Sequence, residues 1–235
     1  MEWHALANKL FPDGHSVQCA GDLLSGTGRC GEHTVTVIGT ANHAAIGVEI
    51  AFAMAEHVLA TIRDHPARPI LILVDTQGQR LRHRDELLGI NAYMAHLAKC
   101  LELARRNGHR ILSLVYGDAV SGGYLASGMM ADACFALHEA EISVMNLPAM
   151  ARVTKIAQER LEELSKTSPV FAPGSGNYFK MGALNAIWEG DLALCLKAAL
   201  GSARTADIRR ELAAERGGRA KALEVSRRVR DEAAA

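Results

Sequence analysis

The amino-acid sequence predicts an α/β fold built around one largely parallel β-sheet. Two continuous apolar runs of strand length, Ile70 to Val74 and Ile111 to Val115, are each followed by a polar segment with glycine and then by a helical pattern. Strands that alternate with helices in this order imply right-handed crossovers between parallel neighbours. The chain has 235 residues, of which 49% are hydrophobic, and so it can bury the core of such a domain.

The N-terminal region is expected to form a short helix and then two strands in a hairpin-like arrangement. The helix spans Trp3 to Leu10, and the strands span Ser16 to Ala20 and His33 to Ile38. Between the strands, Ser25-Gly26-Thr27-Gly28 is rich in glycine and is expected to be a turn. An alanine-rich segment from about Ala44 to Arg63 then predicts a long helix.

The first unit of strand, loop and helix starts at Pro69. Its strand runs to Asp75 and leads into a polar loop, Thr76-Gln77-Gly78-Gln79. From Ile90 onwards, apolar residues recur at spacings of three and four, which is the pattern of one buried helix face. This helix is expected to end near Asn107-Gly108.

The second unit has a strand from Arg110 to Tyr116, a loop from Gly117 to Gly123, and a helix of small residues from Tyr124 to Met130. Two short strands are expected after it, at Ala133 to Leu137 and at Ile142 to Met145. Active sites in such sheets lie in the loops beyond the strand ends. Functional groups are therefore expected in the loops that follow the two long strands.

The remainder of the chain predicts helices, interrupted at Ser168-Pro169 and at Pro173-Gly174-Ser175-Gly176. We expect a single domain over residues 1–235, with a helical C-terminal extension at about residues 204–235. That extension has nine Arg or Lys and six Asp or Glu residues. It is either a solvated pair of amphipathic helices broken at Gly217-Gly218 or a basic docking surface for an acidic partner.

Composition excludes several classes of protein. Lys and Arg number 26 and so do Asp and Glu, so that no basic field for nucleic acid is expected. The apolar runs are far shorter than the roughly 18 residues of a membrane span, and the N-terminus lacks the pattern of a signal peptide. We therefore expect a cytoplasmic, soluble protein. Five scattered cysteines without a C-x-x-C pair predict neither a disulfide framework nor a zinc ribbon.

One glycine motif matches a cofactor fingerprint only in its letters. Residues Gly26 to Gly31 fit the dinucleotide pattern G-x-G-x-x-G. That fingerprint requires a helix to begin at the glycines, whereas the β-branched run His33 to Ile38 predicts a strand. Dinucleotide binding is not expected.

The most informative segment joins the second long strand to its helix and contains Ser121-Gly122-Gly123, here called the glycine turn. Adjacent glycines let a ligand approach the backbone, and N–H groups in the first turn of a helix lack an intrahelical acceptor. Such groups can bind an oxyanion. Two alternatives stay open: the glycines serve only close packing, or Ser121 is a nucleophile at an elbow-like turn, which requires a histidine base.

Five segments in the same order resemble the carboxyltransferase branch of the crotonase superfamily, and most of all the gamma subunit of biotin-independent malonate decarboxylase. They are Val37 to Asn42, Leu73 to Gln79, Ser121 to Tyr124, Ile142 to Asn146 and Tyr178 to Ala183. The resemblance implies a crotonase-like (ClpP/crotonase) ββα-superhelix with C-terminal helices. It covers roughly residues 16 to 200.

The resemblance also implies an activity and its partners. With a homologous beta subunit, such a chain decarboxylates a malonyl thioester on an acyl carrier protein to an acetyl thioester and CO2. The thioester is carried on a CoA-like phosphopantetheine arm, and an acyl-transferase subunit belongs to the same system. No cofactor on this chain, no metal and no biotin are expected.

Site residues follow from the matching segments. Backbone N–H groups of Gly122 and Gly123 are expected to form the oxyanion hole, with Gly78 as a candidate second donor. Substrate contacts are expected from Gln77, Gln79, Ser121 and Tyr124. Whether the glycine turn holds the thioester oxygen or the leaving carboxylate stays open.

Two other functions are weighed against this one. The superfamily includes Clp-type serine peptidases, whose base histidine would fall where this chain has Asn146; the nearest downstream histidine is His138, beside Glu139. The other alternative is a non-catalytic scaffold that completes its partner's fold. The segment from Arg80 to Arg84 either attracts a carboxylate or phosphate or is simply a charged helix start.

Overall fold

The computed structural model describes residues 1–166, 172–202, 207–218 and 220–234. Its strands are β1 (Gln18–Ala20), β2 (Leu23–Cys30), β3 (His33–Thr40), β4 (Ala44–Ile46), β5 (Ile70–Gln79), β6 (Ile111–Val120), β7 (Ala133–Leu137), β8 (Glu141–Ser143) and β9 (Ala186–Trp188). In the described ranges they form one nine-stranded sheet in the order β1-β2-β3-β5-β6-β7-β9, with β4 beside β5 and β8 beside β6. The first three strands are antiparallel, and every pairing from β3 onwards is parallel.

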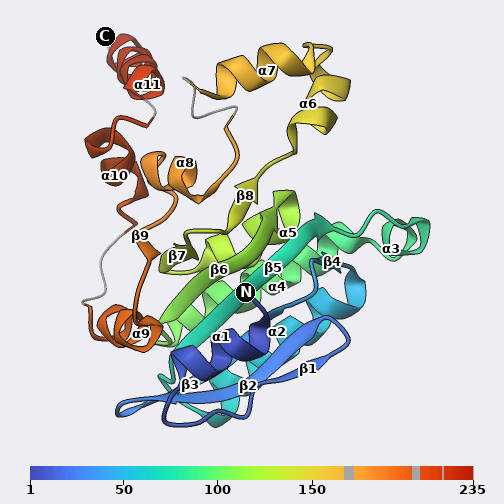
Figure 1. Cartoon of the computed structure of the whole chain (residues 1–235), viewed down its shortest axis with the longest axis vertical. Helices are drawn as coiled ribbons and strands as arrows, with labels where there is room; N and C mark the ends of the chain where they lie inside the picture. Colours follow the sequence, from blue (N-terminus) through green and yellow to red (C-terminus); the bar gives the residue numbers. More distant parts are fainter. Residues whose placement is uncertain (167–171, 203–206, 219, 235) are drawn as a thin grey trace.

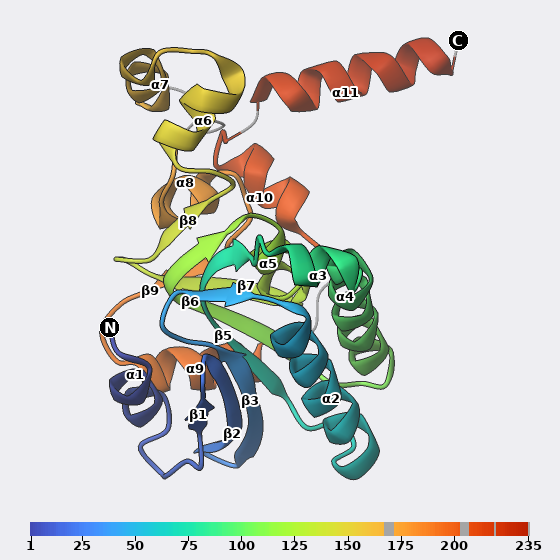
Figure 2. The same ribbon diagram turned by 90° about the vertical axis from the view of Figure 1, so that its right-hand side faces the viewer.

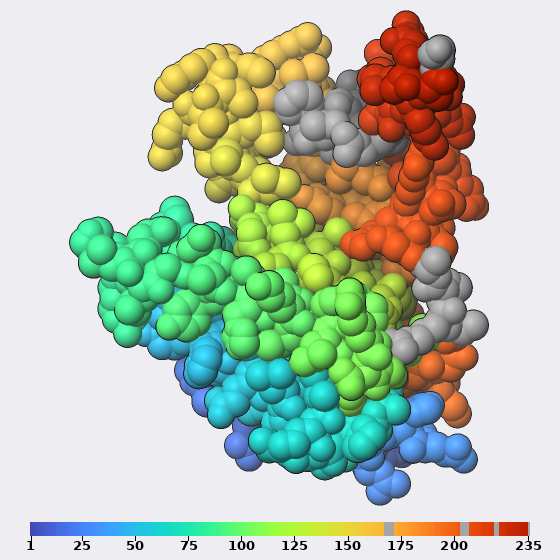
Figure 3. Space-filling view, turned by 180° about the vertical axis from the view of Figure 1, so that it is seen from behind, coloured from blue at the N-terminus to red at the C-terminus, as the bar shows by residue number. Residues whose placement is uncertain are grey.

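Helices cover both faces of this sheet. They are α1 (Trp3–Leu10), α2 (Val48–Asp64), α3 (His83–Leu87), α4 (Ile90–Arg106), α5 (Ser121–Leu125), α6 (Leu147–Thr154), α7 (Gln158–Ser165), α8 (Ser175–Lys180), α9 (Leu192–Gly201), α10 (Arg209–Glu215) and α11 (Ala220–Ala233). Figures 1 and 2 show α1 and α9 on one face and α2 and α4 on the other. Figure 3 shows the second face from behind, where α2 and α4 cover the sheet.

The two faces of β5 explain its unbroken apolar sequence. Leu71 and Leu73 pack with α1 and α9, while Ile70 and Ile72 pack with α2 and α4. Side chains alternate between the faces of a strand, and here helices cover both faces. The predicted α/β class with a parallel sheet is therefore confirmed, and so is the helix Trp3–Leu10.

The glycine-rich segment Ser25 to Gly28 was expected to be a turn, but it lies inside β2 and pairs with β3. Close packing explains why glycine occurs there. A Cβ on Gly26 would lie 2.5 Å from the carbonyl oxygen of Ser16, and one on Gly28 would meet the ring of Phe11. Glycine can mark close approach of backbone or ring inside a strand as well as a turn.

Three further boundaries differ from the sequence prediction. The segment from Ala44 begins as strand β4, and α2 starts only after Gly47. Both expected loops are largely strand, because β5 extends to Gln79 and β6 to Val120. The helix expected from Tyr124 to Met130 is instead α5 followed by a single 3₁₀ turn.

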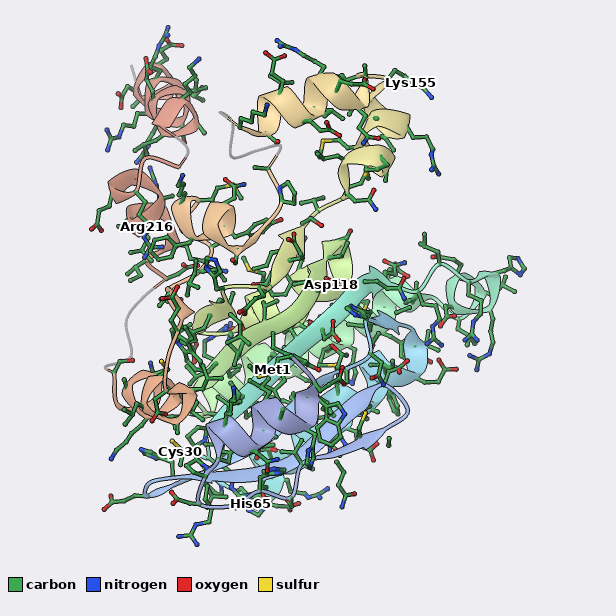
Figure 4. All side chains as sticks on the ribbon, viewed as in Figure 1. Met1, Cys30, His65, Asp118, Lys155 and Arg216 are labelled. Carbon is green, nitrogen blue, oxygen red and sulfur yellow. The ribbon has the colours of Figure 1, made fainter. Side chains whose placement is uncertain are left out.

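Helices α6, α7, α10 and α11 project from the sheet (Figures 2 and 3), whereas α9 packs on it. Helix α6 buries none of its residues, and α10 and α11 form the expected helix pair around Gly217-Gly218. Arg216, labelled in Figure 4, joins this part to the body by donating to the carbonyl oxygens of Phe179 (2.8 Å) and Leu184 (2.7 Å). The expected break at Ser168-Pro169 lies outside the described residues. In the ranges that the structure describes, no helix is long and apolar enough to cross a membrane.

Candidate functional site

The carboxyl ends of β5 and β6 lie side by side in the middle of the sheet (Figure 1). Val74 pairs with Val115, but Thr76 pairs with Ala119, so that β6 holds two extra residues between these pairs. The carboxylate of Asp75 compensates for this irregularity by accepting the N–H of Asp118 at 3.0 Å. The two strand ends are therefore held together by a side chain as well as by the ladder.

The glycine turn begins where β6 ends. Ser121 has φ 51°, in the left-handed region, and α5 starts at this residue. A Cβ on Gly123 would lie 2.8 Å from the carbonyl carbon of Gly78 and 2.9 Å from its Cα, so that only glycine fits. Gly122 is more open, because its Cβ would lie 3.8 Å from Oε1 of Gln79. The structure thus brings the glycine turn together with Gly78 and Gln79.

Backbone geometry at the glycine turn suits an anionic ligand. N–H groups in the first turn of a helix have no intrahelical acceptor, which applies to Gly122 and Gly123 at the start of α5. Gly122 is half-buried and Gly123 is buried. A carbonyl oxygen that approaches this turn from the open side of Gly122 can therefore receive N–H donors in a site of reduced solvent access.

The N–H of Gly78 has a partner within the chain. Its N–H, which we expected to be a second oxyanion donor, donates to Oγ1 of Thr76 at 3.0 Å. The same hydroxyl donates to the carbonyl oxygen of Ala44 at 2.6 Å, so that Thr76 joins β4 to β5. Gly78 is thus the residue against which Gly123 packs, and its N–H is hydrogen-bonded within the chain.

The amides of Gln77 and Gln79 also have partners within the chain. Nε2 of Gln77 donates to the carbonyl oxygen of His43 at 3.0 Å, and Nε2 of Gln79 donates to Oε1 of Glu86 at 3.2 Å. The second bond directs Oε1 of Gln79 towards Gly122. Of the two, Gln79 is therefore the one beside the glycine turn, and its acceptor oxygen faces it.

The ring of Tyr124 lies in the core, although the residue belongs to α5. The residue is 1% exposed and packs in the cluster between the sheet and α2 and α4. A Cβ on Gly128 would lie 2.7 Å from this ring. Burial raises the pKa of the Tyr124 phenol well above its usual value. Its backbone is at the turn, whereas its side chain points away from any ligand there.

The arrangement does not support a serine nucleophile. In the described part of the chain, no imidazole hydrogen-bonds to the hydroxyl of Ser121. His138 is an exposed residue whose Nδ1 lies 3.8 Å from a carboxylate oxygen of Glu189. Asn146 is the N-cap of α6, where its Oδ1 accepts the N–H of Ala149 at 2.9 Å.

The charged segment after β5 forms ion pairs at a helix start. Arg82 donates to the buried carboxylate of Asp85 at 2.7 Å, and Arg84 pairs with Glu49. Asp85 also accepts the N–H of Val48 at 3.0 Å and so caps α2 from a distant segment. The N–H of Val48, followed by the guanidinium of Arg82, lowers the pKa of Asp85. These contacts favour the charged helix start over an anion site.

One group of side chains was missed by the sequence analysis, which named no metal ligand. His43, Asp75 and Asp118 offer ligand atoms that lie within 4.8 Å of one another. Figure 4 shows Asp118 at the end of the sheet near the ends of β5 and β6. A signal did exist, because both aspartates occur near the carboxyl ends of neighbouring parallel strands.

Comparison with known proteins gives one family match. The model of the family described as malonate decarboxylase gamma subunit matches residues 41–233. A curated relative, the malonyl-S-ACP:biotin-protein carboxyltransferase MADD of Malonomonas rubra, is 38% identical over 153 residues, which are 61% of this chain. The match covers 52% of that relative, so the chain spans about half the length of the curated protein that it resembles.

Solved structures are similar over nearly the whole chain. A chain of a Pseudomonas malonate decarboxylase hetero-tetramer in complex with coenzyme A has a TM-score of 0.80 and 26% identity, covering 97% of this chain and 98% of that one. The transcarboxylase 12S core, at 20% identity, has a TM-score of 0.68 over 86% of this chain and 43% of its own. The expected crotonase-like carboxyltransferase fold is thereby confirmed.

Proposed function

The chain belongs to the malonate decarboxylase gamma-subunit family, and from this membership we propose that it is one of two homologous subunits that decarboxylate a malonyl thioester on an acyl carrier protein. The other would be a beta subunit with a similar fold. The similar Pseudomonas malonate decarboxylase is a hetero-tetramer in complex with coenzyme A, which supports both a multi-subunit assembly and a CoA-like thioester arm. An acyl-transferase subunit would load the carrier.

The observation in the structure that supports this proposal is the fit of the glycine turn against Gly78. Decarboxylation moves the electrons of the breaking C–C bond into the thioester carbonyl, giving an enolate that is then protonated at carbon. Donors fixed in place before the reaction stabilise that charge, and the loss of one typically costs about 3–4 kcal/mol. Gly122 and Gly123 would supply such donors from a turn held rigid by packing.

Gln79 is the residue that we propose contacts the arm of the substrate. Its Nε2 is held by Glu86, and its Oε1 faces the glycine turn. An acceptor at that place suits an amide N–H of a phosphopantetheine arm. Gln77 lies one residue from Gly78, is exposed, and would contact the substrate only after giving up its bond to His43.

A second candidate function is supported by the relative from Malonomonas rubra, whose name describes carboxyl transfer to a biotin protein. The same turn would then stabilise the same enolate, but the carboxyl group would pass to biotin on another subunit. The two functions differ only in where the carboxyl group goes. Avidin, which sequesters biotin, stops transfer to biotin and leaves direct CO2 release unchanged.

The test is to co-express the full chain with a candidate beta subunit and to measure labelled CO2 from carboxyl-labelled malonyl carrier protein. The complex is expected to release CO2 with or without avidin. In the same complex, the variant Ser121→Ala is expected to keep most of this activity, because the backbone acts. A chain that is a stable monomer and hydrolyses acyl esters alone would contradict the proposal.

A further inference from the structure

His43, Asp75 and Asp118 meet at the carboxyl edge of the sheet and have no part in the proposed decarboxylation. His43 precedes β4, and the two aspartates belong to β5 and β6. Nδ1 of His43 lies 2.9 Å from Oδ2 of Asp118 and 3.1 Å from Oδ1 of Asp75. Three different segments therefore direct one potential ligand atom each to a single point.

The charges in this cluster are unbalanced. Two carboxylates converge on one imidazole nitrogen, which has at most one proton to donate. In the described residues, His43 is the partner in every ion pair given for Asp75 and Asp118, and its ring is charged only if it is protonated. The side chain of Asp75 is only 9% exposed, and its oxygens Oδ1 and Oδ2 accept the backbone N–H groups of Asp118 and His43, both at 3.0 Å; these hydrogen bonds stabilise its charge but do not neutralise it. A doubly charged ion would balance the cluster better than one proton does.

Hydrogen bonds to the backbone of His43 also hold the cluster in place. Asp75 accepts the backbone N–H of His43 at 3.0 Å through its second oxygen, Oδ2. The carbonyl oxygen of His43 accepts Nε2 of Gln77 at 3.0 Å, which fixes the loop. A Cβ on Gly117 would lie 2.4 Å from Oδ1 of Asp75, so glycine there makes room for the carboxylate. Partners of this kind orient the ligands in metal sites.

We propose that His43, Asp75 and Asp118 bind one divalent transition-metal ion of the zinc or manganese class. Tetrahedral ligands at about 2.0–2.2 Å from such an ion lie about 3.3–3.6 Å from one another, so the present separations of 2.9 and 3.1 Å would have to open by a few tenths of an ångström to admit the ion. Imidazole with two carboxylates is a ligand set for these metals rather than for Ca²⁺. The side chains of His43 and Asp118 are 64% and 37% exposed, which leaves an entry path and room for water.

An ion at this place would join the ends of the two central strands. Asp75 lies three residues before Gly78, and Asp118 lies three residues before Ser121. The ion would therefore fix the spacing of the two segments that pack together at Gly123. This inference does not depend on the proposed function, because it rests on ligand geometry and charge alone.

The experiment is a titration of the metal-depleted full chain with Zn²⁺, and separately with Mn²⁺, by isothermal titration calorimetry. Asp118→Asn and His43→Gln each remove one ligand and leave Asp75 to hold the backbone. His138→Ala is the matched control, because His138 is also exposed beside a carboxylate but lacks a third ligand. Circular dichroism establishes that every variant is folded.

One equivalent of ion is expected for the wild-type chain and for His138→Ala, with at least about tenfold weaker binding for the two ligand variants. Thermal unfolding gives a second measure, since the ion should raise the Tm of the wild-type chain and not that of Asp118→Asn. The proposal is overturned if neither metal binds, or if binding survives unchanged in both ligand variants.

Discussion

The carboxyl ends of β5 and β6 are neighbours with similar sequences, but the chain continues differently after the apolar part of each strand. Both strands are ten residues long, and both pass from apolar residues to a segment with aspartate and glycine. At the end of β5, Thr76 satisfies the N–H of Gly78 and the strand continues beside β4. At the end of β6, the chain turns at Ser121 into a helix. A glycine beside a strand end is therefore not enough to predict an anion site. Whether its N–H already has a hydrogen-bond partner within the chain decides whether the glycine can bind an anion.

The largest expected effect is that of Gly123→Val, which would remove the space for an anion at the end of β6. The new side chain would collide with the backbone of Gly78 and displace the turn. Loss of one oxyanion donor lowers kcat by about 100- to 1,000-fold, and CO2 release by the complex should fall at least that far. Gly201→Val is the control, because space around Gly201 is open. Full activity of Gly123→Val would favour a scaffold role for this chain.

The opposite change, at the end of β5, removes the hydrogen-bond partner of the N–H of Gly78. Thr76→Val keeps the shape of the side chain but leaves the N–H of Gly78 and the carbonyl oxygen of Ala44 without their partner. Each unsatisfied buried group costs about 1–3 kcal/mol, so the free energy of unfolding should fall by that order in urea denaturation. Thr34→Val, on an exposed part of β3, should change stability far less.

The same variant also measures how far Gly78 can act as a donor. If the end of β5 is purely structural, the kcat of folded Thr76→Val complex should stay within about threefold of wild type, since each tenfold corresponds to about 1.4 kcal/mol. A rise of tenfold or more would show that the freed N–H of Gly78 joins the oxyanion hole. That result would restore the role that the sequence suggested for it.

The sequence predicted the end of β6 better than that of β5 for a physical reason. A glycine pair at a helix start is a local signal, and α5 begins at Ser121. The bond from Gly78 to Thr76 depends on β4, whose pairing with β5 is a tertiary contact that local periodicity does not contain. Likewise, the glycines of β2 face Ser16 and Phe11, which no short window includes.

The His43 cluster illustrates the same limit at longer range. Its members are 32 and 43 residues apart in sequence, and they meet only because parallel neighbours align their carboxyl ends. Aspartate near the end of each strand was visible in the sequence. The place of His43 follows from its backbone bond to Asp75, which requires the folded loop.

A third, smaller effect on stability should appear at acid pH, and it should arise in the segment after β5, where Asp85 lies in α3. Hydrogen bonds from Val48 and Arg82 lower the pKa of Asp85, so its contribution to stability is complete above about pH 4 and is lost as pH falls through the folded-state pKa. Asp85→Asn should lower the Tm by about 2–6 °C at pH 7, and the difference from wild type should shrink below pH 4. Thermal melts between pH 3 and pH 7 measure this.

Asp64→Asn is the control for that series, because Asp64 pairs with Arg63 in an exposed position. Surface ion pairs contribute little, so its Tm should differ from wild type by about 1 °C or less at any of these pH values. Equal pH profiles for Asp85→Asn and Asp64→Asn would mean that Asp85 does not anchor the segment after β5.

The smallest expected effect is that of Ser121→Gly at the end of β6. Ser121 has φ 51°, and a non-glycine residue pays about 1–2 kcal/mol there, which glycine would relieve. Glycine also adds about 0.5–1 kcal/mol of entropy cost on folding, so the net change in unfolding free energy should be below about 1 kcal/mol. CO2 release should change by less than about threefold, since the N–H groups of Gly122 and Gly123 keep their positions. A loss of activity as large as that of Gly123→Val would mean that the hydroxyl of Ser121 takes part in the reaction, and the contrast between the two strand ends would then rest on a side chain instead of the backbone.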